Sequence, residues 1–213
     1  MSEPVAYRGR VKYTKETSKK YQQRKPSKHR AEMRVLDRAF KLIPKTHKVL
    51  DVPCGGGRVT IHLSKKGYEV SAADLSEDMI EIARQALADN KLDCSVERQD
   101  VEKFTLGDRS FDTIVSFRLF HHFPNPEIRQ RVAKELCRVA AHNVVLSYFS
   151  PNSWTSVKRK LRAARGGRKS DKHATSLVEV EDYFKKVGFR LVKNFARAPL
   201  IHTLHVAVFE RSR

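Results

Sequence analysis

The chain has 213 residues, enough for one domain, or one domain with an appendage, around a sizeable core. Hydrophobic residues make up 40% of it, and no apolar run approaches the roughly 20 residues that cross a bilayer, which excludes an integral membrane protein. The formal net charge of +19 favours an anionic partner.

Positive charge is concentrated in two segments. Residues 1–48 hold 15 basic and 4 acidic side chains, and residues 158–172 hold 8 basic and 1 acidic. The rest of the chain is almost neutral. Because a clustered field attracts an anionic partner to one surface, we expect these two segments to contact that partner.

The N-terminal segment and the cysteines indicate a compartment. The first 25 residues are polar and basic, without the apolar centre of a secretory signal. The three cysteines, Cys54, Cys94 and Cys137, are scattered and lack metal-ligand spacing. We therefore expect a protein of the reducing cytoplasm, with neither a disulfide framework nor a metal site.

The first predicted helix follows a basic, tyrosine-containing arm, residues 1–26. Ser27 is a suitable N-cap, and Pro44 ends the helix. Apolar residues recur between them at helical spacing, namely Met33, Leu36, Phe40 and Ile43. This helix should pack on the core of a domain that comprises residues 27–213.

From Lys48 onward, short β-branched runs alternate with helical stretches, which is typical of a parallel sheet built from βαβ units. The predicted strands are residues 49–52, 69–73, 94–98, 113–117 and 143–149. Asn125 and Pro126 suit the cap and first position of the helix before the last of these strands.

The C-terminal part predicts a helix at about residues 179–187, closed by Gly188, and two strands at 190–193 and 203–209 that pair as an antiparallel hairpin. The expected fold is therefore α/β: a Rossmann-like, seven-stranded, mostly parallel sheet with helices on both faces and a final antiparallel hairpin.

An insertion at about residues 151–178 separates the fifth strand from this C-terminal part. Trp154, Val157, Leu161 and Ala164 recur there at helical spacing, and basic residues fill most other positions. The insertion predicts an amphipathic basic helix followed by a loop at residues 165–174, a combination that suits an anionic surface.

A glycine-rich turn follows the first strand. In residues 49–58, VLDVPCGGGR, glycines let the backbone turn tightly and approach a ligand. Asp74 ends the second strand, where a carboxylate can accept hydrogen bonds from both ribose hydroxyls. Asp100 follows the third strand and can meet an adenine amino group, with Val101 beside the ring; a loop or cap role is the alternative for Asp100.

These motifs resemble the class I S-adenosylmethionine-dependent methyltransferases, in the branch of the ubiquinone/menaquinone methyltransferases, over about residues 45–150. The resemblance implies S-adenosyl-L-methionine as cofactor, with Asp51, Gly55 and Gly57 at its methionine part, Asp74 at ribose and Asp100 at adenine. The remaining cofactor-site candidates are Pro53, Cys54, Arg58, Leu75, Val101 and Phe117.

Two features test this resemblance. Pro53 replaces the family's first glycine and should shape the turn of the loop, since proline fixes φ and lacks an amide donor. The rival interpretation is a dinucleotide site of the Gly-x-Gly-x-x-Gly type. Thr60 occupies the third glycine position and would obstruct close helix-to-strand packing, and Asp51 would place a charge near a pyrophosphate, so we favour the methyltransferase.

The segment after the fourth strand should face the transferred methyl group, as the resemblance implies. It contains Arg118, His121 and His122. Either histidine can remove a proton from a hydroxyl acceptor near neutral pH, and Arg118 can hold an anionic group of the acceptor. The alternative is structural, with one histidine packed in a turn under the cofactor and the other facing solvent.

The acceptor is left open by the sequence. The basic segments favour an anionic acceptor, with lipopolysaccharide or another envelope glycan or lipid-linked molecule preferred, and with peripheral contact to the inner membrane. RNA is an alternative, because tyrosines interleave with cations in residues 7–25, and so is a quinone-like small molecule. An alternative of a different class is a non-catalytic subunit that binds S-adenosylmethionine and presents its basic arm to a partner protein.

Overall fold

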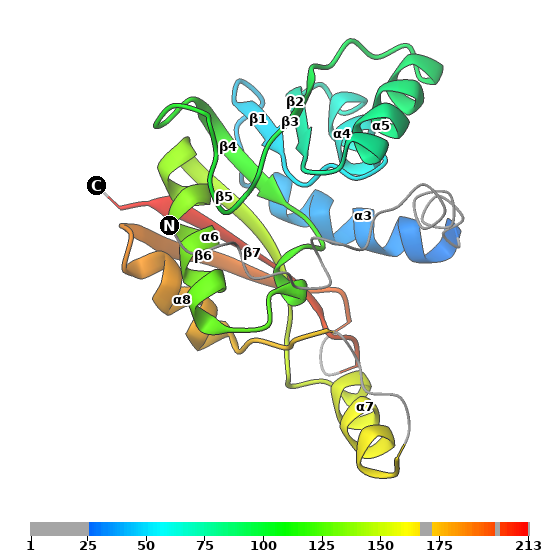
Figure 1. Ribbon diagram of the computed structural model, residues 1–213, viewed down its shortest axis with the longest axis vertical. Coiled ribbons are helices and arrows are strands. Elements are labelled where there is room, and N and C mark those ends of the chain that lie inside the picture. Colours follow the sequence, from blue (N-terminus) through cyan, green and yellow to red (C-terminus); the bar gives the residue numbers. More distant parts are fainter. Residues whose placement is uncertain (1–25, 167–171, 199–200, 213) are drawn as a thin grey trace.

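The computed structural model describes residues 26–166, 172–198 and 201–212. Their centre is a seven-stranded sheet of order β3-β2-β1-β4-β5-β7-β6 (Figure 1). β1 to β5 are parallel, whereas β7 runs antiparallel to both β5 and β6. The strands are β1 Lys48–Asp51, β2 Glu69–Asp74, β3 Val96–Arg98, β4 Phe111–Ser116, β5 Ala140–Phe149, β6 Phe189–Ala196 and β7 Leu204–Arg211.

Six α-helices and a 3-10 turn accompany the sheet in the described residues. They are α3 Pro26–Phe40, α4 Arg58–Ser64, α5 Glu77–Asp89, η1 Phe120–His122, α6 Pro126–Val139, α7 Trp154–Ala164 and α8 Leu177–Lys185. Side-chain caps begin three of them: Ser76 accepts from the amide of Met79, Asn125 from Ile128 and Ser176 from Glu179.

Helices cover both faces of the sheet. On one face, α6 and α8 pack against β4, β5 and β7 around residues such as Leu136, Phe184 and Phe209. On the other, α3 and α4 bury Leu36, Phe40 and Leu63 against β1, β2 and β7. The predicted fold class is therefore confirmed, including the antiparallel hairpin at the C-terminus.

Most predicted elements lie within a few residues of the observed ones, and the differences have local causes. α3 already includes Pro26, so Ser27 lies inside the helix and is not its cap; a proline suits the first helical turn. The N-terminal arm lies outside the described residues, as does the centre of the predicted loop at residues 165–174.

The parallel strands bring together the loops that contain the predicted site residues. Because β1, β2 and β4 run in the same direction, the segments that follow them emerge at one edge of the sheet. The insertion begins at this edge too, since β5 is parallel to β4. Among the described residues, no helix has the length and apolar character needed to cross a bilayer.

Candidate functional site

The loop between β1 and α4 is a compact turn anchored to β2. The amide of Cys54 donates to the carbonyl of Ala73 over 2.8 Å, and the amide of Gly57 donates to the carbonyl of Cys54 over 3.1 Å. Gly57 has a φ of 75°, a conformation that a side chain disfavours, and it starts α4 directly. The glycine is therefore needed for the sharp strand-to-helix turn.

Asp74, at the end of β2, fastens this loop to the next one. One carboxylate oxygen accepts from the amide of Gly55 over 2.9 Å, and the other accepts from the amide of Ser76 over 3.0 Å. Burial raises the pKa of Asp74, and the backbone amide donors oppose that shift. Each oxygen has a further lone pair, so the carboxylate can still accept hydrogen bonds from a ligand.

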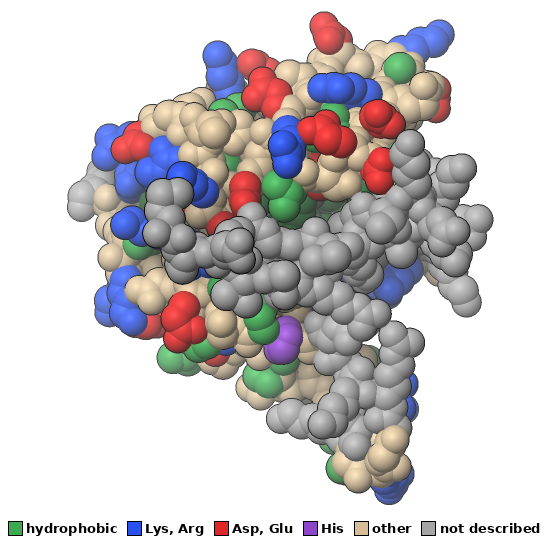
Figure 2. Space-filling model, viewed as in Figure 1, with side chains coloured by type: hydrophobic (Ala, Val, Ile, Leu, Met, Phe, Trp, Pro, Cys, Tyr) green, Lys and Arg blue, Asp and Glu red, His purple; other side chains and the backbone are tan. Residues whose placement is uncertain are grey.

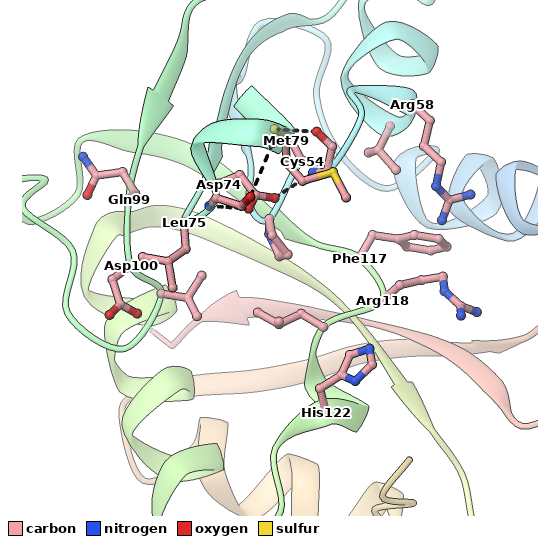
Figure 3. A pocket seen from close by; sticks show the side chains of 16 residues that line it. Cys54, Arg58, Asp74, Leu75, Met79, Gln99, Asp100, Phe117, Arg118 and His122 are labelled. Atoms are coloured by element: carbon pink, nitrogen blue, oxygen red, sulfur yellow. Dashed lines mark hydrogen bonds between the residues drawn. The ribbon is translucent and has the colours of Figure 1, made fainter. Parts of the chain in front are cut away.

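A cavity opens over these loops (Figure 3). Its lining comes from the segments after β1, β2, β3 and β4, together with η1 and the first turns of α4 and α5. The lining residues are Pro53, Cys54, Gly55, Arg58, Val59, Asp74, Leu75, Ser76, Met79, Gln99, Asp100, Val101, Phe117, Arg118, Leu119 and His122.

The charges in this cavity are separated. Figure 3 shows Asp74 near its centre, Asp100 to one side, and the guanidinium groups of Arg58 and Arg118 on the opposite side. Apolar side chains, among them Leu75 and Phe117, lie between the charged groups. The cavity can therefore hold a ligand whose hydroxyl and amino groups face the carboxylates and whose anionic group faces the arginines.

Most of the sequence-predicted site residues meet in this cavity, but three do not. Asp51, Gly57 and His121 are absent from its lining. Pro53, a cofactor-site candidate that was also expected to shape the turn, contributes to the cavity wall. The predicted order of strands and loops was sufficient to place Gly55, Asp74 and Asp100 at one site.

Asp51 is fully buried behind the loop. One of its oxygens accepts from the hydroxyl of Thr60 over 2.7 Å, while the other has no hydrogen-bond partner in the described part of the chain. Burial raises the pKa of Asp51 to about 7. Thr60, which departs from the dinucleotide pattern, thus ties α4 to the end of β1.

The two arginines of the cavity are held by one carboxylate from α3. Glu32 is fully buried and accepts from Arg58 over 2.8 Å and from Arg118 over 3.0 Å. Glu32 was not predicted from the sequence as a site residue. Its burial could have been predicted, because it lies four residues before Leu36 and eight before Phe40, on the apolar stripe of the helix.

The two adjacent histidines have different surroundings. His121 is fully buried, and its ring stacks on Phe149 with centroids 3.9 Å apart and an interplanar angle of 5°. His122 is partly exposed and lines the cavity. The prediction that either histidine could serve as a base is corrected to His122 alone, because packing removes His121 from the cavity.

Five lining residues were also missed: Val59, Ser76, Met79, Gln99 and Leu119. Ser76 and Met79 carried a signal, because a cap residue two positions after Asp74 places the first turn of α5 beside that carboxylate. Gln99 immediately precedes Asp100, and its side chain binds Thr105 over 2.9 Å.

Comparison with known proteins supports the resemblance. Residues 49–143, less than half of the chain, match the sequence profile described as "Methyltransferase domain". The resemblance drawn from about residues 45–150 is thereby confirmed, and S-adenosylmethionine is the cofactor of this domain family.

Curated relatives match less than half of the chain. The ubiquinone biosynthesis O-methyltransferase of Coxiella burnetii is 36% identical over 83 residues, which are 39% of this chain and 36% of that enzyme. The enzyme of the same name from Azoarcus is 36% identical over 81 residues, 38% of this chain and 35% of the relative. The chain thus matches about a third of the length of these relatives.

Solved structures share the fold of the methyltransferase domain over most of the chain. Magnesium protoporphyrin IX methyltransferase from Synechocystis with bound SAH has a TM-score of 0.72 and 17% identity, and the match covers 85% of this chain and 83% of that one. A protein from Pyrococcus horikoshii has a TM-score of 0.71 and 21% identity, covering 86% and 91%. At these identities the likeness concerns the fold.

Proposed function

We propose that the protein is an S-adenosylmethionine-dependent methyltransferase acting on a small, amphipathic acceptor. The observation that carries this proposal is the cavity in which Asp74, bonded to the amide of Gly55, lies among residues from four neighbouring strand ends. The methyltransferase domain at residues 49–143 supports the same activity.

The residues of the cavity fit S-adenosylmethionine. The carboxylate of Asp74 can accept from the ribose hydroxyls, since the backbone amides of Gly55 and Ser76 each bind one of its oxygens and each oxygen has remaining acceptor capacity. Asp100 can accept from an adenine amino group, with Leu75 and Val101 as apolar neighbours. Arg58 can hold the methionine carboxylate. When bound, the cofactor supplies an electrophilic methyl group.

The acceptor end of the cavity contains Arg118, Leu119 and His122. Methyl transfer is an in-line displacement, so these residues act mainly by positioning the acceptor in a site shielded from water. His122 can remove the proton of a hydroxyl acceptor, because its imidazole lines the cavity and can act as a general base. Arg118 can pair with an anionic group of the acceptor.

The named activity of the relatives supports one class of acceptor. Both relatives described above are O-methyltransferases of ubiquinone biosynthesis, which supports a quinone-like phenolic acceptor. Nothing in the comparisons supports the lipopolysaccharide or glycan acceptor that the sequence favoured. We therefore replace that preference with the small-molecule alternative, and the excess of cations favours an acceptor that carries a carboxylate.

Cofactor binding is the first test. Titration calorimetry with S-adenosylmethionine should show that Asp74→Asn weakens affinity roughly 100-fold or more, since two hydrogen bonds to a charged group are lost. Asp93→Asn makes the same change at an exposed carboxylate outside the cavity and should bind like the wild type. Equal affinity of wild type and Asp74→Asn would remove the basis of the proposal.

Acceptor identity is the second test. The protein is incubated with methyl-labelled cofactor and a panel of simple and prenylated phenols, each with and without a carboxylate on the ring. Label should enter a phenolic hydroxyl, and Arg118→Gln should raise KM for the carboxylated compounds more than for their neutral counterparts. Label found only in RNA or glycolipid after incubation with a fractionated cell extract would contradict this acceptor class.

A further inference from the structure

Helix α7 displays its apolar side chains to solvent. The side chains of Trp154, Val157 and Leu161 are 56%, 43% and 47% exposed. They recur at helical spacing and form one stripe. Ile201, 64% exposed, lies next to this stripe, because its carbonyl accepts from the amide and the hydroxyl of Thr155 over 3.3 and 2.6 Å. We refer to Trp154, Val157, Leu161 and Ile201 as the α7 patch.

The side of α7 that faces the protein is polar. Ser156 of α7 is buried, as is Ser153 just before the helix, and the hydroxyl of Ser156 donates to the carbonyl of Ser150 over 3.0 Å. A surface helix of a globular protein normally turns its apolar stripe toward the core. In α7 the described side chains have the opposite arrangement, so the apolar stripe faces away from the part of the chain that the structure describes.

The α7 patch contrasts with the other exposed apolar residues. The remaining large hydrophobic side chains exposed in the described residues are Leu42, Val178 and Val192, each on a different element or connecting turn. Single exposed apolar residues are ordinary on protein surfaces, whereas a contiguous group marks an interaction site. The α7 patch is the contiguous group here.

Cations share the exposed side of α7. Lys158 lies four residues after Trp154, with its ammonium 5.3 Å from the centroid of the Trp154 ring, and Arg165 lies four residues after Leu161. Arg162 is also exposed, and α7 contains no acidic residue. The surface therefore combines an apolar stripe with adjacent positive charges, whose aliphatic stems can lie along apolar material while their charged ends reach anions.

Figure 1 shows α7 projecting from the sheet, and Figure 2 shows Lys and Arg side chains at that end of the molecule. In the same view, the opposite part, where α5 lies, shows acidic side chains interspersed with Lys and Arg. An anionic surface would therefore attract the α7 end more strongly than the α5 end, which orients the molecule.

The base of α7 is connected to the acceptor end of the cavity. β5 ends at Phe149, five residues before α7 begins, and the Phe149 ring stacks on His121, the neighbour of His122. The guanidinium of Arg118 lies 5.5 Å from the centroid of the same ring. A surface that bound α7 would thus lie on the side of the molecule where the acceptor is expected.

We propose that the α7 patch docks into the interface of an anionic phospholipid bilayer, with Lys158, Arg162 and Arg165 at the lipid phosphates. RNA would satisfy the cations and stack on Trp154 but would offer no apolar surroundings to Val157 and Leu161. A second copy in a two-fold dimer would bring like cations together. An anionic bilayer accommodates both the apolar stripe and the charges.

Docking does not depend on methyl transfer. Docking would let a lipid-soluble acceptor enter the cavity from the bilayer, and this consequence rests on the proposed function. The two ideas fail separately: the Asp74→Asn variant should still bind vesicles, and a variant of the α7 patch should still bind S-adenosylmethionine.

The experiment uses the intrinsic fluorescence of the full chain, in which Trp154 is the sole tryptophan. Vesicles of phosphatidylcholine with phosphatidylglycerol should shift its emission to shorter wavelength, and brominated lipids should quench it. Vesicles of phosphatidylcholine alone should bind weakly, and high salt should weaken binding to the anionic vesicles.

Two matched substitutions test the surface. Val157→Asp, in the α7 patch, should weaken vesicle binding roughly tenfold or more, because it removes apolar contact and adds a repelled charge. Val178→Asp makes the same change on α8 at a position 78% exposed and should bind like the wild type. Both positions are exposed, so both variants should keep the fold, which circular dichroism checks.

Several outcomes would overturn the proposal. Absence of vesicle binding by the wild type would do so, as would equal binding to neutral and anionic vesicles or equal weakening by Val157→Asp and Val178→Asp. An emission shift that appears with RNA but not with vesicles would assign the surface to nucleic acid. A shift that grows with protein concentration alone would assign it to self-association.

Discussion

Removing the charge of Glu32 should destabilise the protein, although Glu32 lies outside the cavity lining. The side chain is fully buried on α3 and binds Arg58 and Arg118, whose side chains are 17% and 10% exposed. Glu32→Gln preserves the size of the side chain but leaves two guanidiniums facing a neutral amide with one acceptor oxygen. The substitution therefore separates the effect of charge from that of packing.

The expected cost follows from the burial of all three groups. A hydrogen bond to a charged group contributes about 1.5–3 kcal/mol, and removing one partner of a buried ion pair costs about 3–5 kcal/mol. Glutamine retains one weaker hydrogen bond, so we expect the lower end, about 3 kcal/mol. For a chain of this size each kcal/mol lowers the melting temperature by about 2–4 °C, which predicts a decrease of about 6–12 °C.

Urea unfolding followed by circular dichroism measures this change, with melting temperature as a second readout. The control is Asp37→Asn on the same helix, which removes contacts of 2.7 Å to His62 and 3.2 Å to Lys66. Asp37 is 28% exposed, so its loss should cost about 1 kcal/mol or less. If Glu32→Gln costs no more than Asp37→Asn, the buried cluster does not stabilise the fold as argued.

Three further predictions concern the site. Because burial raises the pKa of Asp51 to about 7, the folded state retains its proton between about pH 4 and pH 7 while the unfolded state does not. Stability should therefore fall as pH rises through this window, and Asp51→Asn should remove a dependence of roughly 1 kcal/mol per pH unit; urea unfolding at pH 5 and pH 7 with an unchanged difference would contradict this. Gly57→Ala should cost about 1–2 kcal/mol because the residue has a φ of 75°, whereas Gly107→Ala, where no atom lies within 4 Å of a new side chain, should be nearly neutral in thermal unfolding. His122→Gln should lower kcat by about 10²–10⁴ while calorimetry shows little change in cofactor affinity, and an unchanged kcat would exclude His122 as the base.

Local sequence signals were sufficient for the order of elements and for much of the cavity. Asn125 and Pro126 begin α6 as their cap and first-turn chemistry predicts. Gly55 and Asp74 meet because glycine marks the turn after β1 and because the ends of parallel neighbouring strands lie at one edge. Such signals span a few residues and depend little on the rest of the chain.

Tertiary packing decided what these signals could not. Glu32 and Arg118 are 86 residues apart, and their ion pair exists because α3 packs beside the cavity. Contacts between other distant segments bury Asp51 behind its loop and stack His121 on Phe149, while His122 stays at the cavity. Helical spacing predicted α7, but only the exposure of Trp154, Val157 and Leu161 in the folded chain shows that its apolar stripe faces outward. The sequence pattern records which side chains share a face, whereas the direction of that face depends on contacts between distant segments.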